Sequence, residues 1–154
     1  MTRDQKIYRL TYWIACFILG GTFALSAYIK FVDPVAFVLA VERYKLLPSS
    51  LVNIIALGFQ WVETCCAVCL LGVPRLRKPA LWVVLGLLIV FSGAIIINLI
   101  RGAQITCGCF NNGPDAEPLS WLTVGRNLML MTLVGLAFIA QKRSRQEAGS
   151  NTDD

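Results

Sequence analysis

The sequence contains no histidine and few charged residues. Without histidine, the chain cannot form histidine-ligated haem, histidine-containing zinc sites or Ser-His-Asp triads, and it cannot use imidazole in acid–base catalysis. Charged residues make up 15% of the chain, whereas about 25% is usual in a soluble domain. A chain with so little charge cannot cover its folded surface with polar groups, so a water-soluble domain is excluded.

Hydrophobic residues are correspondingly abundant. They make up 56% of the 154 residues, and the mean hydropathy is +0.65. There are no internal repeats or low-complexity segments, so this composition predicts one integral membrane domain in contact with a lipid bilayer. The net charge of +5 comes from short basic clusters between apolar runs. Such clusters are typical of residues at lipid headgroups rather than of nucleic-acid binding.

Four apolar runs are each long enough to cross a bilayer core of about 30 Å as a helix. We therefore predict an all-α fold, an integral membrane four-helix bundle over residues 10–140. A polar segment at residues 1–9 precedes it, and a disordered tail at residues 141–154 follows. The predicted helices occupy about residues 10–31, 51–72, 80–100 and 119–140.

The first apolar run has an alternative interpretation as a signal peptide. Ala24-Leu25-Ser26 resembles a cleavage site built from small residues. However, the run is longer than a typical signal-peptide core and continues to Lys30 and Phe31. We therefore predict that it is retained as the first membrane helix.

Residues 35–50 connect the first two predicted helices and are half polar. We expect a short amphipathic segment at the membrane interface. Tyr44 suits the headgroup layer, and four apolar side chains are expected to face lipid. They are Val35, Phe37, Val38 and Val41.

Lysine and arginine are divided unequally between the two sides of the predicted bundle. Nine lie on the side of the termini: Arg3, Lys6, Arg9, Arg75, Arg77, Lys78, Lys142, Arg143 and Arg145. Five lie on the other side: Lys30, Arg43, Lys45, Arg101 and Arg126. The positive-inside rule then predicts cytoplasmic termini, with the loop at residues 101–118 on the periplasmic or exterior face of a bacterial inner membrane. That is the side where disulfides persist.

Two cysteines separated by one glycine, Cys107-Gly108-Cys109, lie in this outer loop. Gly108 permits the backbone torsions of a small disulfide ring, and ring strain makes such a disulfide easy to reduce. We therefore predict a redox-active pair and no metal site. Separate structural disulfides, inert thiols and Cu(I) binding by thiolates are the alternatives. No Met or His cluster accompanies the pair, and a four-thiolate iron–sulfur site would need further loop cysteines.

Glu63 is a carboxyl group about halfway along the second predicted helix. A titratable residue inside the membrane is a candidate functional residue by default, and this one could carry protons in thiol or quinone chemistry. We predict that it is protonated, or is paired with Arg101 or Arg126, or locks helix packing through Asn98 or Asn127. Arg101 and Arg126 flank the outer loop, where they either favour cysteine thiolates or extend to lipid headgroups.

Four more cysteines lie within the apolar runs: Cys16, Cys65, Cys66 and Cys69. Cys65 and Cys69 share a helix face, because residues four apart are neighbours, so they are candidates for a second, inner thiol pair. Cysteine also packs as a small apolar residue between helices. We favour packing for all four.

Several spaced residues form a pattern that resembles a known family. The first part of the pattern is Gly20-Gly21-x-Phe23, Lys30-Phe31-x-Asp33-Pro34, Tyr44-x-Leu46-Leu47-Pro48 and Glu63. The second part is Arg101-Gly102, Cys107-Gly108-Cys109-Phe110, Trp121 and Arg126-Asn127. The first part resembles the DoxX-like membrane proteins, and the second is similar to their MauE branch, named for methylamine utilisation. The resemblance covers about residues 10–140 and departs from the family pattern at Asn111, where the family has glycine.

This resemblance implies a four-helix membrane bundle and a redox function. MauE-type proteins are linked, with a thioredoxin-like partner, to maturation of the disulfide-rich small subunit of methylamine dehydrogenase. By resemblance, Cys107 and Cys109 are the exchanging pair, and quinone is a candidate electron acceptor because relatives in the wider family act with quinones. The implied supporting residues are Glu63, Arg101, Gly108, Arg126 and Asn127.

Two other functions fit the same sequence. One is a non-enzymatic membrane scaffold or anchor for a redox partner, in which the loop cysteines would be dispensable. The other is a protein that handles a soft metal or a small solute.

Overall fold

All regular secondary structure is helical in a computed structural model of the chain, which describes residues 3–45, 48–102 and 121–150. The helices are α1 (Arg3–Val32), α2 (Pro34–Arg43), α3 (Ser49–Gly72), α4 (Arg77–Ile100) and α5 (Trp121–Ser150). A short 3-10 turn, Pro74–Leu76, joins α3 to α4.

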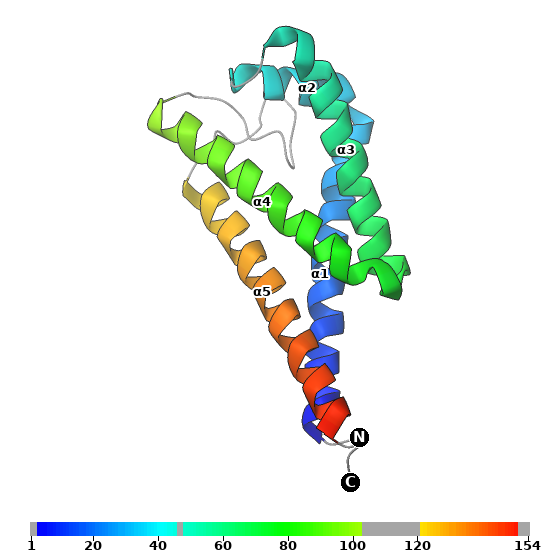
Figure 1. Cartoon of the computed structure of the whole chain (residues 1–154). Helices are drawn as coiled ribbons and strands as arrows, with labels where there is room; N and C mark the ends of the chain where they lie inside the picture. Colours follow the sequence, from blue (N-terminus) through cyan, green and yellow to red (C-terminus); the bar gives the residue numbers. More distant parts are fainter. Residues whose placement is uncertain (1–2, 46–47, 103–120, 151–154) are drawn as a thin grey trace.

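The four long helices are apolar and long enough to cross a membrane. Their candidate spans are Lys6–Val32, Ser50–Gly72, Pro74–Ile100 and Trp121–Ser144. α1 packs extensively against both α3 and α5, and α4 also contacts α3 and α5. The start of α1 and the end of α5 lie at one end of the bundle, and α2 lies at the other (Figure 1). This arrangement confirms the predicted helical membrane bundle.

The bundle core is aliphatic and draws on every long helix. Its fully buried side chains include Leu19 of α1, Leu70 of α3, Leu81 of α4 and Val134 of α5. Many large apolar side chains remain on the outside, and Ile100 is 77% exposed. Such an exterior is stable in lipid, where apolar surface carries no hydration cost.

Two helices, α1 and α5, extend furthest beyond their predicted ranges. α1 begins at Arg3, inside the segment expected to be polar and separate. α5 continues to Ser150, through most of the tail that was predicted to be disordered at residues 141–154. Glutamine, lysine, arginine and glutamate are good helix formers, so they extend a helix that an apolar span has already nucleated.

Arg77 is buried at the start of α4, whereas its basic cluster predicted a place at lipid headgroups. Its Nε donates a hydrogen bond to the Leu70 carbonyl oxygen at 2.8 Å, and its Nη2 donates to the Leu71 carbonyl oxygen at 3.4 Å. Carbonyls in the last turn of a helix have no partner within that helix. The guanidinium also lies 3.7 Å from the centroid of the Trp13 ring. Arg77 therefore caps α3 and ties the turn after it to α1.

α2 is a short helix whose inner side is buried. Asp33 caps its start by accepting a hydrogen bond from the Ala36 N–H at 3.0 Å, and Pro34 occupies the first turn. Val35 is exposed as predicted, but Phe37 is buried rather than facing lipid, and Tyr44 is buried rather than lying among headgroups. The segment packs on α3 and α1, which removes one of its sides from lipid. Its place at the membrane interface stays a prediction.

Gly20 allows α1 to approach α3 closely. A Cβ atom at this position would lie 2.8 Å from the Leu71 side chain and 3.2 Å from Leu70 Cβ. We expect Gly20→Val to lower stability by about 1–3 kcal/mol, the usual cost of overpacking, measured as a lower unfolding temperature in detergent. Gly21→Val is the matched control, because a Cβ at Gly21 meets no atom within 4 Å. Equal losses in the two variants would contradict the close contact.

Candidate functional site

A buried ion pair joins α1 to α3. Lys30 Nζ lies 2.5 Å from Glu63 Oε2, and the two side chains are 0% and 5% exposed. Side chains on a helix lean toward its N-terminus, so Lys30, near the end of α1, reaches back into the bundle. α3 runs in the opposite direction beside α1 and presents Glu63 there (Figure 1). Burying a charge costs desolvation free energy unless the charge is paired and hydrogen-bonded. The Lys30 ammonium and the Glu63 carboxylate provide that pairing for each other.

Lys30 was not among the partners predicted for Glu63. That carboxyl group was expected to be protonated, to pair with Arg101 or Arg126, or to bond to Asn98 or Asn127, and the structure gives it an ion pair with Lys30. Asn98 Nδ2 donates to the Ala94 carbonyl oxygen in its own helix, at 2.9 Å. Lys30 was counted among headgroup residues because it stands at the end of an apolar run, which is where lysines usually extend to the interface.

Two phenylalanine rings complete the surroundings of the Lys30 ammonium. Its Nζ lies 4.6 Å from the ring centroid of Phe37 on α2 and 5.3 Å from that of Phe91 on α4. Both distances are within the range of cation–π attraction, which is strongest where water is excluded. The ammonium is therefore held by side chains from α2, α3 and α4, with the carboxylate as its charged partner.

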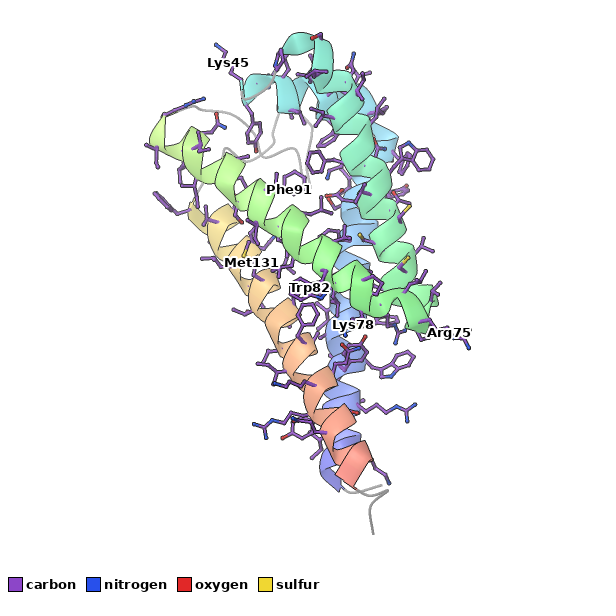
Figure 2. All side chains as sticks on the ribbon, viewed as in Figure 1. Lys45, Arg75, Lys78, Trp82, Phe91 and Met131 are labelled. Atoms are coloured by element: carbon purple, nitrogen blue, oxygen red, sulfur yellow. The ribbon has the colours of Figure 1, made fainter. Side chains whose placement is uncertain are left out.

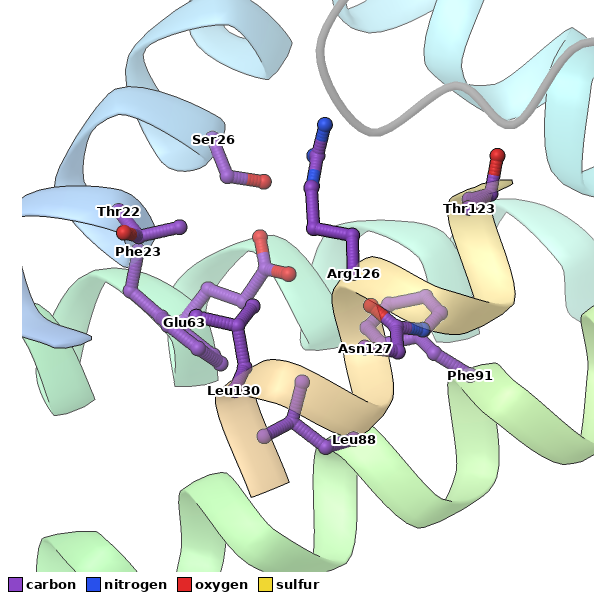
Figure 3. A pocket seen from close by; sticks show the side chains of 10 residues that line it. All are labelled: Thr22, Phe23, Ser26, Glu63, Leu88, Phe91, Thr123, Arg126, Asn127 and Leu130. Atoms are coloured by element: carbon purple, nitrogen blue, oxygen red, sulfur yellow. The ribbon is translucent and has the colours of Figure 1, made fainter. Parts of the chain in front are cut away.

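A polar cavity of about 40 Å³ borders Glu63 between α1, α3, α4 and α5. A cavity of roughly 10–15 Å³ measured in this way accommodates one water molecule, so this one has room for more than one. Figure 3 shows the residues around it, with Glu63 and Arg126 facing the same space from α3 and α5. The lining residues are Thr22, Phe23, Ser26, Glu63, Leu88, Phe91, Thr123, Arg126, Asn127 and Leu130.

The structure thus brings together three of the residues predicted for the site, which are Glu63, Arg126 and Asn127. Arg101 is elsewhere, exposed at the end of α4 and absent from the cavity lining. Gly102 follows with a φ of +67°, a left-handed conformation that commonly ends helices. Cys107, Gly108 and Cys109 lie outside the described residues, in the segment that connects α4 to α5.

The inner cysteines are free thiols in the bundle. Cys16 and Cys66 are buried in the same aliphatic core cluster, and Cys69 packs against it. Cys65 is exposed on the lipid-facing side of α3. Within the described ranges, no three acidic or cysteine side chains come together to hold a metal ion. An inner thiol relay stays a prediction.

Lys30 is the site residue that sequence reasoning missed. Glu63 carried a signal that could have found it, because a carboxylate deep in a membrane helix requires a basic partner.

Two other buried polar side chains lie outside the ion pair. Among the described residues, Gln60 Oε1 and Ser92 Oγ are buried side-chain atoms without a hydrogen-bond partner. Each keeps hydrogen-bonding capacity for water or for a ligand.

Comparisons with known proteins agree on one family. A family model described as methylamine utilisation protein MauE matches residues 8–140. The methylamine utilization protein MauE of Paracoccus denitrificans is 37% identical over 131 residues, which cover 84% of this chain and 69% of that protein. The proteins of that name from Methylorubrum extorquens and Methylophilus methylotrophus are 40% and 41% identical over 101 and 91 residues.

The matches to the last two relatives cover 64% and 58% of this chain but only 53% and 47% of the relatives, about half their length. No solved structure matches the chain. The wider DoxX-like grouping stays a prediction, because the family match concerns MauE alone. With the family model matched over nearly all of the membrane bundle, the chain belongs to the family of the methylamine utilisation protein MauE.

Proposed function

We propose that this chain is a membrane thiol–disulfide redox protein that serves methylamine utilisation. In the proposed reaction, the Cys107–Cys109 disulfide accepts two electrons and two protons from two thiols of a partner. The partner's sulfurs form a disulfide, and the S–S bond between Cys107 and Cys109 breaks to give two thiols. The same steps run in reverse when the partner carries the disulfide, so the exchange is balanced in either direction.

One structural observation carries the proposal. Glu63, Arg126 and Asn127, which were singled out with the cysteines from the sequence, line one cavity. Arg126 and Asn127 lie in the first two turns of α5, which begins at Trp121. The segment that bears the two cysteines leads directly into this helix. The cavity therefore extends from Glu63, near the middle of α3, to the first two turns of α5, the helix that the cysteine segment leads into.

The ionisable groups suit the proton traffic of thiol exchange. Forming a disulfide from two thiols releases two protons, and thiolates are the attacking species. A carboxylate that borders a cavity with room for water can accept and pass on a proton, and Glu63 has this position. Arg101, at the end of α4, brings positive charge to the beginning of the cysteine segment, where it favours the thiolate form.

The proposed orientation places this end of the bundle outside the cytoplasm of a bacterial inner membrane. Arg77 is buried, so eight of the nine basic residues on the side of the termini can contact headgroups. Lys30 is also buried, so four of the five on the other side can do so. The excess stays on the side of the termini, so the positive-inside rule still favours cytoplasmic termini. Arg75 and Lys78 lie at the α3–α4 turn, far from Lys45 at the α2 end (Figure 2).

Two partners follow from this role. A thioredoxin-like protein outside the cytoplasm would exchange disulfides with the loop during maturation of exported proteins. A quinone in the membrane would accept the electrons, since it takes up two electrons and two protons to become a quinol. The three relatives named for methylamine utilisation support a place in that process.

Thiol tagging of the full-length protein tests the proposal. Membranes are treated with an oxidant or a reductant, denatured and reacted with a mass-tagged maleimide. With six cysteines in the chain, we expect two tags fewer after oxidation than after reduction. The difference should vanish in the Cys107→Ser, Cys109→Ser double variant and persist in a Cys65→Ser, Cys69→Ser variant. An equal number of tags under both conditions in the unmodified protein would overturn the proposal.

A further inference from the structure

A second cavity, of about 520 Å³, lies between α2, α3 and α4. α3 and α4 diverge from the turn that joins them, and α2 lies across the open end (Figure 1). The residues that line this apolar cavity are Phe37, Val41, Tyr44, Ile55, Phe59, Ile89, Val90, Phe91, Gly93, Ala94 and Ile97. Its volume is within the range of about 300–1,000 Å³ that is usual for small-molecule sites.

The cavity is accessible from the lipid side of the bundle. Ile89 and Val90, both lining residues on α4, are 56% and 55% exposed. Because α4 crosses the apolar layer, a molecule dissolved in the membrane can enter without passing through water. The occupant is therefore expected to be lipid-soluble.

The walls favour a flat ring over an aliphatic chain. Four of the eleven lining residues are aromatic, namely Phe37, Tyr44, Phe59 and Phe91, although aromatic residues make up only 10% of the sequence. Phe59 and Phe91 already lie against each other, with ring centroids 5.4 Å apart. Aromatic rings gain specific stacking and edge-to-face contacts with another ring, whereas an acyl chain gains only dispersion from them.

A charged donor stands behind the same wall. Phe37 and Phe91, which line the apolar cavity, are the two rings that flank the Lys30 ammonium. Phe91 also lines the polar cavity around Glu63, so this residue borders both cavities. Charged groups therefore lie behind the aromatic wall of an otherwise apolar cavity.

We propose that this cavity binds the ring of a membrane quinone, with Tyr44 as the lining residue that carries a hydrogen-bonding group and the Lys30–Glu63 pair behind the rings of Phe37 and Phe91. The assignment rests on the proposed thiol–disulfide function, because two cysteine thiols release two electrons and two protons when they form a disulfide. A quinone takes up two electrons and two protons to give a quinol, so the two half-reactions balance. The polar cavity, which Phe91 also borders, provides a route for those protons.

Photolabelling of the purified protein in lipid nanodiscs tests the site, with a short-chain azido-benzoquinone as the probe. We expect saturable labelling of α2 or α4, reduced by an excess of the unlabelled benzoquinone. Gly93→Leu fills the cavity and should lower labelling by about tenfold or more, equivalent to at least 1.4 kcal/mol of binding free energy. Gly86→Leu is the matched control on the same helix, because Gly86 does not line the cavity and a Cβ at either glycine meets no atom within 4 Å.

Several results would overturn the site. The first is labelling that is not saturable, and the second is labelling outside the cavity. The third is an equal reduction of labelling by Gly93→Leu and Gly86→Leu. A photoreactive acyl-chain lipid that labels the cavity and is not displaced by the benzoquinone would assign the space to lipid. If Gly93→Leu does not fold, as judged by its unfolding temperature, Ala94→Leu replaces it.

The binding measurement does not depend on the cysteines. The Cys107→Ser, Cys109→Ser variant should bind the benzoquinone as the unmodified protein does. If the unmodified protein exchanges thiols but does not bind the benzoquinone, the quinone site is overturned and the proposed function is not. Intact binding without thiol exchange would overturn the proposed function but leave a quinone site.

Discussion

Replacing Lys30 with methionine is expected to destabilise the protein by about 3–5 kcal/mol, the largest effect on stability that the structure predicts. The substitution keeps the apolar stem of the side chain but leaves the Glu63 carboxylate without its partner, which is 2.5 Å away. An unpaired charge in a buried site must either be desolvated at high cost or take up a proton. Denaturant titration of the purified protein in detergent would measure the loss.

The same chemical change at an exposed lysine provides the control. Lys78→Met, near the start of α4, removes a solvent- or headgroup-facing charge and should change stability by no more than about 0.5 kcal/mol. The Lys30→Met, Glu63→Leu double variant should recover much of the lost stability, because an apolar pair of similar size replaces both charges. Equal stability of Lys30→Met and Lys78→Met, or additive losses in the double variant, would show that the buried pair is not formed.

Single cysteine substitutions are expected to abolish thiol exchange, the largest effect on activity. A serine hydroxyl is not ionised near neutral pH, so it neither attacks a disulfide nor forms one. With reduced bacterial thioredoxin as the probe, oxidised unmodified protein should be reduced while thioredoxin is oxidised. Cys107→Ser and Cys109→Ser should both fall to the rate of the protein-free mixture.

The two single variants should differ in one respect. When the cysteine that contacts the partner remains and the other is replaced, the mixed disulfide cannot be resolved within the loop. The probe for this step is a thioredoxin variant that keeps only its attacking cysteine, activated as the mixed disulfide with thionitrobenzoate. The remaining loop thiol of one variant should attack this disulfide, release thionitrobenzoate and accumulate as a covalent complex on a non-reducing gel, and the double variant should form none. Cys65→Ser, at an exposed position on α3, should exchange as the unmodified protein does. Normal exchange by the double variant would favour a scaffold role instead.

The helices follow from the sequence because length and hydropathy alone determine them. An apolar run of about 20 residues must satisfy all its backbone hydrogen bonds within itself in lipid. From that constraint, α3 was predicted to begin two residues after its observed start, Ser49, and to end at its observed last residue, Gly72. It says nothing about polar residues beyond the apolar run, so α5 was predicted to stop short of Ser150.

The ion pair could not be predicted because it depends on how α1 and α3 align. Lys30 and Glu63 are 33 positions apart, and only the packing of the two helices brings them together. The same is true of Arg77, whose contacts with α3 and Trp13 come from a turn of three residues. Both basic residues stand at the edge of an apolar run, where interfacial and buried positions have the same sequence pattern. Phe37 was misplaced for a related reason, since α2 buries one side against neighbours that periodicity does not reveal.

The prediction that Glu63, Arg126 and Asn127 act together came from residue chemistry and the family pattern, and the cavity that they share supports it. That Cys107 and Cys109 complete this site remains the central proposal. Trypsin cleaves after Arg101 and Arg126, which yields one peptide, residues 102–126, with these two cysteines and no other. Mass analysis of this peptide therefore reports directly on their pairing.

The decisive measurement is a redox titration of the purified full-length protein against dithiothreitol, with the mass of peptide 102–126 recorded at each potential. The oxidised peptide is expected to be lighter by two hydrogen atoms, and a single two-electron transition should convert it to the dithiol. A peptide that holds two free thiols at every potential, or that is linked to another cysteine of the chain, would contradict the proposal.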